Sequence, residues 1–184
     1  MIPRKLAGMN PPLVILVTGL PATGKSRLAE ALARRFGCPL LAKDAIKEPL
    51  LDVLGGGDRA WSRKLSDASF AVLFGLARAI LATARPLVVE GNFRAGVHEE
   101  SLRPLVAAGP LIQFLCTAPD TARATRLAAR ATDATRHPGH DDAALLAEAP
   151  GNTGFLDLPG ERITYDSTAT DVDRVVRARF PQGE

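Results

Sequence analysis

The residues Gly19–Ser26 constrain the fold of this chain more than any other stretch. They read Gly-Leu-Pro-Ala-Thr-Gly-Lys-Ser and match the pattern G-x-x-x-x-G-K-[ST] at every fixed position. The apolar run Leu13–Thr18 precedes them with the length and composition of a buried strand, and the Ala- and Leu-rich stretch Lys25–Phe36 follows with the composition of a helix. This order predicts a loop whose backbone N–H groups surround the phosphates of a nucleotide.

Each fixed position of the loop has a physical role. The glycines let the backbone curl so that successive N–H groups converge, and the start of the helix adds the positive end of its dipole. Lys25 is expected to reach the β- and γ-phosphates, and the Ser26 hydroxyl is expected to bind Mg²⁺. We therefore predict ATP and Mg²⁺ as cofactors. The predicted nucleotide site contains Gly19, Pro21, Ala22, Thr23, Gly24, Lys25, Ser26 and Arg27.

Other apolar runs predict a parallel sheet. They are Pro39–Ala42, Pro86–Gly91, Leu111–Cys116 and Arg162–Tyr165, and most of the runs lack strict alternation, which is typical of strands covered on both faces. Helical patterns occupy most of the intervening chain, over Lys25–Phe36, Ala45–Leu54, Ala60–Ala84, Ala118–Ala131 and Asp171–Phe180. Strands that alternate with helices predict a three-layer α/β domain with a five-stranded parallel sheet and right-handed crossovers.

Length and composition favour one soluble, intracellular domain. The 184 residues show no internal repeat and no dividing linker, so we expect a single domain over 1–184. The segment 132–160 is rich in Asp, Gly and Pro and is predicted to be a mobile lid. No apolar run is long enough for a membrane span, and Cys38 and Cys116 resemble buried reduced thiols, so we expect a cytoplasmic protein without a membrane partner.

Acidic residues follow the second and third apolar runs. Asp44 lies just after the second run, at the carboxyl edge of the predicted sheet, where ligands of α/β proteins bind. A carboxylate there could orient an attacking hydroxyl, or it could cap the following helix. Glu90 ends the third run and could bind Mg²⁺ through water, or it could be a polar strand end before a tight turn at Gly91.

Arginines and histidines gather in the second half of the chain. Arg123, Arg126 and Arg130 recur at three- and four-residue spacing and can share one face of a helix, either over the phosphates or in solvent. His137 and His140 could ligate zinc together with nearby aspartates. Because no cysteine or second histidine cluster accompanies them, a turn in the lid or a contact with the acceptor is the favoured interpretation.

From Leu13 to Phe180, the order of these motifs resembles that of the P-loop kinase superfamily. The resemblance is closest to small AAA_33-type ATP-binding proteins similar to polynucleotide 5′-hydroxyl kinases, zeta-toxin kinases and chloramphenicol phosphotransferases. It implies the strand order 2-3-1-4-5, a closing lid, and a loop over 167–170 that borders the adenine. The sequence departs from the pattern where Lys47 stands for a commoner Arg and where Glu90 stands for an Asp in several relatives.

The resemblance also implies roles for individual residues. Asp44 would accept the proton of the attacking hydroxyl, and Lys47 would hold an anionic group of the acceptor. Asn92 and Arg94 are expected to face the acceptor. Lid arginines would cover the phosphates and complete the catalytic site. They are Arg126, which also contacts the nucleotide, Arg130, and Arg136, which would arrive on closure and contact the substrate.

These features predict an ATP-dependent phosphotransferase that moves the γ-phosphate to a hydroxyl of a small-molecule acceptor. A polynucleotide 5′ end is the alternative acceptor, but a net charge of +3 and few aromatic residues for base stacking give it little support. A regulatory ATP-binding switch with slow hydrolysis is the rival from another class. The N/T-K-x-D motif of GTPases is absent from the sequence. Neither the acceptor nor the oligomeric state follows from the sequence.

Overall fold

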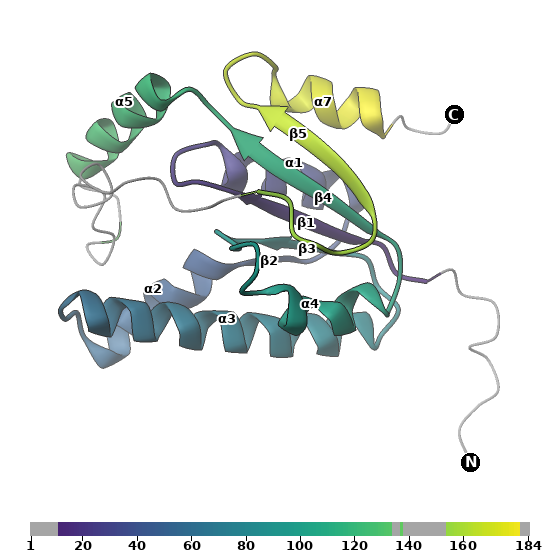
Figure 1. The fold of residues 1–184 in the computed structure, drawn as a ribbon, viewed down its shortest axis with the longest axis horizontal. Coiled ribbons are helices and arrows are strands. Elements are labelled where there is room, and N and C mark those ends of the chain that lie inside the picture. Colours follow the sequence, from purple (N-terminus) through teal and green to yellow (C-terminus); the bar gives the residue numbers. More distant parts are fainter. Residues whose placement is uncertain (1–10, 134–136, 138–153, 181–184) are drawn as a thin grey trace.

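Five parallel strands form a single sheet in the computed structural model, which describes residues 11–133, 137 and 154–180 (Figure 1). The strands are β1 (Val14–Gly19), β2 (Leu40–Ala42), β3 (Leu87–Glu90), β4 (Leu111–Thr117) and β5 (Glu161–Asp166). Their spatial order is β2-β3-β1-β4-β5, with every pair parallel. The predicted five-stranded parallel sheet and its order 2-3-1-4-5 are therefore confirmed.

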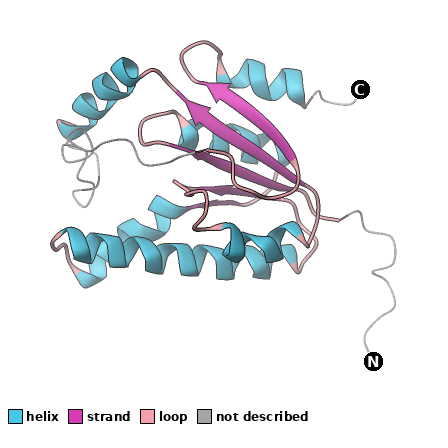
Figure 2. Ribbon diagram, in the orientation of Figure 1, coloured by secondary structure: helices cyan, strands magenta, loops and turns pink. Residues whose placement is uncertain are grey.

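Helices cover both faces of this sheet (Figure 2). They are α1 (Lys25–Phe36), α2 (Lys43–Leu54), α3 (Arg59–Leu81), α4 (Glu99–Val106), α5 (Asp120–Ala131) and α7 (Val172–Arg179). Alternate residues of β1 point to opposite faces: Val14 and Leu16 join the cluster under α3 and α4, and Ile15 and Val17 join the cluster under α1 and α7. Burial on both faces explains why the central strands β1 and β3 are almost continuously apolar.

The helix α4 was not predicted, and α2 begins two residues earlier than expected. Only eight residues long, α4 contains Pro104 and begins after His98, whose side chain makes no capping hydrogen bond. These features hide the usual sequence signals of a helix. At α2, the capping position is Ala42 in an extended conformation, so Asp44 lies inside the first turn. The alternative that Asp44 is the N-cap is therefore wrong.

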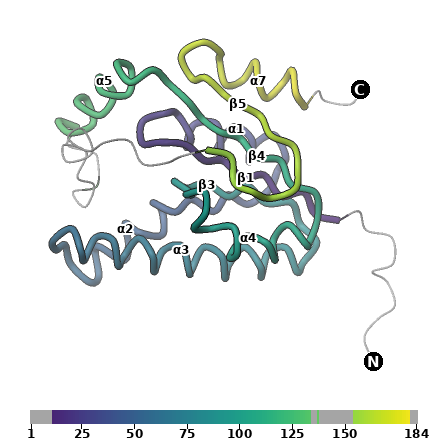
Figure 3. Tube along the Cα trace, viewed as in Figure 1, coloured from purple at the N-terminus to yellow at the C-terminus, as the bar shows by residue number. Residues whose placement is uncertain are grey.

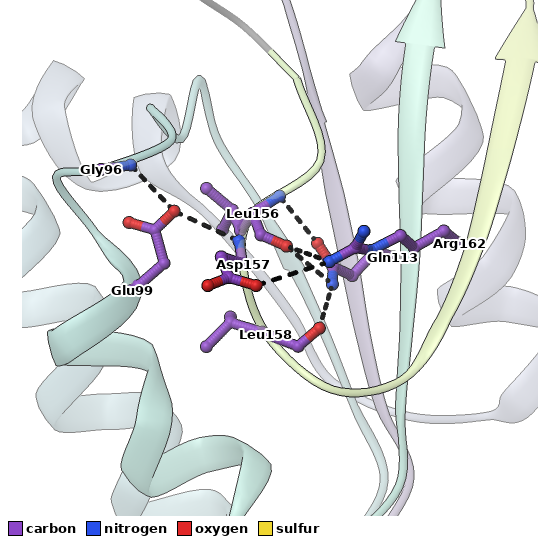
Figure 4. Close-up of polar contacts among 7 residues, drawn as sticks. All are labelled: Gly96, Glu99, Gln113, Leu156, Asp157, Leu158 and Arg162. Carbon is purple, nitrogen blue, oxygen red and sulfur yellow. Dashed lines mark hydrogen bonds and ion pairs between the residues drawn. The ribbon is translucent and has the colours of Figure 1, made fainter.

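The segment 154–160 leads into β5 (Figure 3) and is fastened to the sheet by a buried carboxamide (Figure 4). Gln113 of β4 is fully buried, and its Oε1 accepts from the Leu156 N–H at 3.1 Å. Its Nε2 donates to the carbonyls of Leu156 and Leu158 at 3.3 and 3.2 Å. Both leucine side chains join the core beside α3 and α4. A buried polar side chain inside the sheet thus helps to fix this connection.

The described helices include none that combines the length and apolar character needed to span a membrane.

Candidate nucleotide and phosphate-transfer site

The loop after β1 has the backbone conformation that its glycines permit. Gly24 is left-handed with φ of 87°, and a Cβ placed on it would lie 3.0 Å from the Ser167 Cβ. A Cβ on Gly19 would lie 2.3 Å from the carbonyl oxygen of Cys116 at the end of β4. Ala22 adopts φ of 63° although it carries a side chain. The loop is therefore curled, and it also packs closely against the end of β4 and the residue that follows β5.

Lys25 is folded back onto this loop. Its Nζ donates to the Leu20 carbonyl at 2.9 Å, and the Thr23 hydroxyl donates to the same carbonyl at 2.8 Å. Burial lowers the pKa of Lys25, while the charges of Glu90 and Asp44 act in the opposite direction. The lysine that the motif assigns to phosphate thus lies in the field of two acids, one at the end of β3 and one in the first turn of α2.

Glu90 lies at the centre of the carboxyl edge. It pairs in register with Val17 of β1 and with Ala42 of β2, and it is 5% exposed. Burial raises the pKa of Glu90, Lys25 opposes this, and Asp44 adds to it. The Ser26 side chain, at the start of α1, also acts to lower the pKa of this carboxyl. Two hard oxygen donors side by side fit the ligand chemistry of Mg²⁺.

The first turn of α2 carries Asp44 between two lysines. Lys43 Nζ donates to Asp44 Oδ1 at 3.0 Å. The Lys43 side chain is 8% exposed and that of Asp44 is 53% exposed. Lys47 is also buried, and its Nζ donates to the Ser62 hydroxyl of α3 at 2.8 Å. Burial lowers the pKa of Lys47, and Lys43 adds to this effect. Asp44 is therefore a half-exposed carboxylate flanked by two buried lysines.

The loop between β3 and α4 displays Asn92 and Arg94, which are both exposed. Phe93 between them is fully buried, and its carbonyl accepts from the Thr18 hydroxyl of β1 at 3.3 Å. The Arg94 N–H donates to His98 Nδ1 at 2.8 Å. These contacts hold the loop at the carboxyl edge of the sheet, where Glu90 ends β3.

Two arginines of α5 contact carbonyls of the phosphate-binding loop. Arg123 Nε donates to Pro21 O at 3.1 Å, and Arg126 donates to Ala22 O at 3.0 Å. The same Arg126 nitrogen donates to the Ser167 hydroxyl at 2.8 Å. These contacts bring α5, the loop and the start of the segment 167–170 together. The solvated-face alternative therefore does not describe Arg123, which is 9% exposed.

The remaining predicted residues are distributed as follows. Arg130 is half-buried, and its charge acts to lower the pKa of Lys25. Arg27 is exposed on α1. Arg136 and His140 lie outside the described residues, as does most of the predicted lid. His137 Nε2 lies 2.9 Å from Asp52 Oδ1 of α2. Within 11–133, 137 and 154–180, no three His, Cys, Asp or Glu side chains cluster in a way that could hold a metal.

Sequence reasoning missed Lys43 and Ser62. Neither belongs to a motif, and a lysine beside an aspartate is usually read as a solvated pair. The burial of Lys43 and its contact with Asp44 depend on the folded structure, as does the contact of Ser62 with Lys47. No signal in the sequence marks them.

Comparison with known proteins places this arrangement in a family. The sequence profile described as AAA domain (AAA_33) matches residues 14–148. A crystal structure from Chloroflexus aurantiacus j-10-fl, of a protein with a provisional kinase assignment, is 33% identical with a TM-score of 0.82. It covers 95% of this chain and 100% of its own. The chain belongs to the AAA_33 family, within the P-loop kinase superfamily.

More distant structures share the fold. A sugar kinase from Janibacter sp. HTCC2649 is 13% identical with a TM-score of 0.62 and covers 92% of each chain. The APS kinase of Mycobacterium tuberculosis, solved with AMPPNP and APS, is 18% identical with a TM-score of 0.58, covering 93% of this chain and 96% of its own. An uncharacterised protein of M. tuberculosis is 29% identical over 160 residues, or 80% of this chain. The chain spans about a third of the length of that curated relative (32%).

Proposed function

We propose that this chain is an ATP- and Mg²⁺-dependent phosphotransferase that moves the γ-phosphate of ATP to a hydroxyl of a small-molecule acceptor. The observation that carries the proposal is the convergence of Lys25, Glu90 and Asp44, which come from different elements and act on one another electrostatically. The provisional kinase assignment of the Chloroflexus aurantiacus protein supports it. The kinase names of more distant structures agree with the same reaction class.

The loop side of the site binds the nucleotide. Its N–H groups and Lys25 offset the charge of the phosphates, for which Lys25 exchanges its bond to the Leu20 carbonyl. Arg126 and Ser167 border the loop on the side of β4 and β5 and contact the nucleotide there. Arg130 and Arg136 cover the transferring group when the site closes.

Ser26 and Glu90 hold the metal. A bound Mg²⁺ would offset the negative charge that develops on the phosphates during transfer. Glu90 can hold a metal only as a carboxylate. Because burial raises the pKa of Glu90, metal binding should weaken as the pH falls toward that pKa.

Asp44 acts on the acceptor. Its carboxylate receives the proton of the attacking hydroxyl as that oxygen bonds to the γ-phosphorus, and the bond from that phosphorus to the β-phosphate oxygen breaks to release ADP. Lys47, Asn92 and Arg94 contact the acceptor around Asp44. Because few aromatic residues are available for base stacking, a small acceptor is favoured over a nucleic-acid 5′ end.

The test is an ATP-consumption screen over nucleosides, sugars, aminoglycosides and 5′-hydroxyl oligonucleotides, followed by detection of the phosphorylated product. With the acceptor found, Asp44→Asn should lower kcat by about 100-fold or more while the Kd for ATP, measured by calorimetry, stays unchanged. Asp173→Asn, an exposed change on the distant helix α7, is the matched control.

Two results would count against this function. If no acceptor accelerates ATP consumption above a slow basal rate, the regulatory switch becomes the better description. If Asp44→Asn transfers phosphate at the wild-type rate, Asp44 is not the group that acts on the acceptor.

A further inference from the structure

Lys43 is the least exposed charge at the carboxyl edge that has no role in the mechanism above. We propose that it is a positioning residue, whose buried ammonium fixes the carboxylate of Asp44 toward the acceptor hydroxyl. The inference rests on the proposed function, because the role of Asp44 belongs to it.

The local backbone explains how adjacent residues make this contact. Side chains one position apart do not meet on a helix surface. Lys43, however, is the first residue of α2, and it follows Ala42, which is extended with φ of −102° and ψ of 129°. Its long side chain can therefore fold beneath the first turn and reach Asp44 Oδ1 at 3.0 Å.

The burial of Lys43 makes this contact more than a surface ion pair. A lysine with an 8% exposed side chain loses rotamer freedom and most of its hydration, which disfavours burial unless a partner compensates. Exposed pairs contribute little because both side chains must be ordered. Here the protein has already ordered the ammonium, so Asp44 gains a fixed partner although it is itself 53% exposed.

The charges around Lys43 indicate why a cation is needed there. Glu90 pairs in register with Ala42, two residues before Asp44, so both acids lie at the same edge of the sheet and repel each other, and Lys43 lies between Ala42 and Asp44 in the sequence. Lys43 thus lies within electrostatic reach of both acids. A fixed cation beside Asp44 stabilises a carboxylate close to the other acid and limits its rotation, which keeps the reacting groups aligned.

The test is a double-mutant cycle with Lys43→Met, Asp44→Asn and the double variant, assayed with the acceptor from the screen. Lys43→Met should lower kcat roughly 100-fold, as expected when a reacting group is misplaced by about 1 Å. The KM and Kd for ATP should not change. In the Asp44→Asn background the same substitution should have no further effect, because Lys43 acts only through Asp44. Lys43→Arg should restore most of kcat, since it returns a cation to the site.

Several outcomes would overturn the inference. It fails if Asp44→Asn is inactive while Lys43→Met keeps the wild-type kcat, or if Lys43→Met lowers the rate equally in both backgrounds. A Lys43→Arg variant that folds but stays as slow as Lys43→Met also contradicts it. If instead Asp44→Asn is fully active, the proposed role of Asp44 fails, and the role of Lys43 fails with it.

A second measurement needs no acceptor. In carboxyl ¹³C NMR of the free protein, the Asp44 resonance should titrate at a higher pH in Lys43→Met than in wild type, because a neighbouring cation favours the ionised form. Unchanged titration overturns the positioning role, whatever the screen finds. If the titration shifts but the screen finds no acceptor, the contact between Lys43 and Asp44 is supported and only the proposed function fails.

Discussion

At Gly24, the backbone and a neighbouring residue both exclude a side chain. The residue is left-handed, and it lies against Ser167, which also receives a hydrogen bond from Arg126. A methyl group here would strain the loop and push away the residue that joins the loop to α5. Both constraints apply at Gly24, so the conformation of the phosphate-binding loop depends on the residue that follows the edge strand β5.

Gly24→Ala should therefore weaken ATP binding by tenfold or more, as measured by calorimetry, since strain at such a position costs about 1–2 kcal/mol. Gly75→Ala is the matched control. Gly75 lies inside α3, and nothing lies within 4 Å of a Cβ placed on it. This control should bind ATP normally and stabilise the protein by up to about 1 kcal/mol. Equal ATP affinity in both variants would contradict the role assigned to Gly24.

Glu90, the proposed metal ligand, is predicted to lower the stability of the folded protein at neutral pH. Because its pKa is raised in the folded protein, the folded state prefers the protonated form, so Glu90 favours folding at low pH and disfavours it as the pH rises above the unfolded value of about 4.5. Glu90→Gln should raise the melting temperature of the nucleotide-free protein at pH 7.5 and weaken Mg²⁺-dependent ATP binding. Glu30→Gln, exposed on α1, should change neither. A destabilised Glu90→Gln variant would contradict this prediction.

The element that joins β3 to α4 depends on a buried histidine. The His98 ring is 6% exposed and packs on Phe70 with ring centroids 4.4 Å apart. Its Nδ1 accepts from the Arg94 N–H. The contacts hold the loop that displays Asn92 and Arg94, so the state of this ring bears on the candidate acceptor side of the site.

Acidification should loosen this element. Burial and then the charge of Arg94 lower the pKa of His98, while Glu99 and Asp67 act to raise it. A lowered histidine pKa means that the unfolded state takes up a proton first, so stability falls as the pH drops from about 6.5 through the folded-state pKa. Urea denaturation between pH 8 and 5 should show a steeper loss in wild type than in His98→Gln. Parallel curves would show that His98 does not contribute.

Local signals predicted the long elements well and the short ones poorly. The helix α1 was predicted with its exact bounds, because its motif, its Ala/Leu pattern and Gly37 all mark it. The helix α4 was missed, since Pro104 and an uncapped start obscure eight residues. At the site, Lys25, Glu90 and Asp44 act on one another electrostatically, because their elements end or begin at the same edge of the sheet. Lys43 and Gln113 could not be found, because their importance arises from burial by elements distant in the sequence.

Across the whole molecule, the segment 154–160 is held by polar contacts at two points. One is Gln113 in β4. The other is Glu99 at the start of α4, whose Oε1 accepts from the N–H groups of Gly96 and Asp157 at 2.9 and 3.3 Å (Figure 4). These contacts join α4, the central sheet and the chain that leads into β5. Two buried polar side chains, Gln113 and Glu99, therefore connect this segment to the sheet and to α4.

Gln113→Leu should destabilise the protein by about 3 kcal/mol in urea denaturation, because it leaves the Leu156 N–H and the Leu158 carbonyl buried without their partner. Arg162→Gln is the control. It removes the bond from Arg162 to the Leu156 carbonyl, which Gln113 still occupies, and Arg162 is half-exposed. We expect less than about 1 kcal/mol for this change. If Gln113→Leu lowers the free energy of unfolding no more than Arg162→Gln does, the carboxamide is dispensable for stability.

The strand order has a consequence for how such a protein can diversify. The residues 40–106 form β2, α2, α3, β3 and α4 without interruption, and both of their strands lie on one side of β1. This continuous piece carries Asp44, Lys47, Asn92 and Arg94, whereas the phosphate-binding loop, α5 and β5 lie outside it. Recombination at two points could therefore exchange the proposed acceptor residues, together with the proposed metal ligand Glu90, between relatives while the phosphate-binding loop is inherited unchanged.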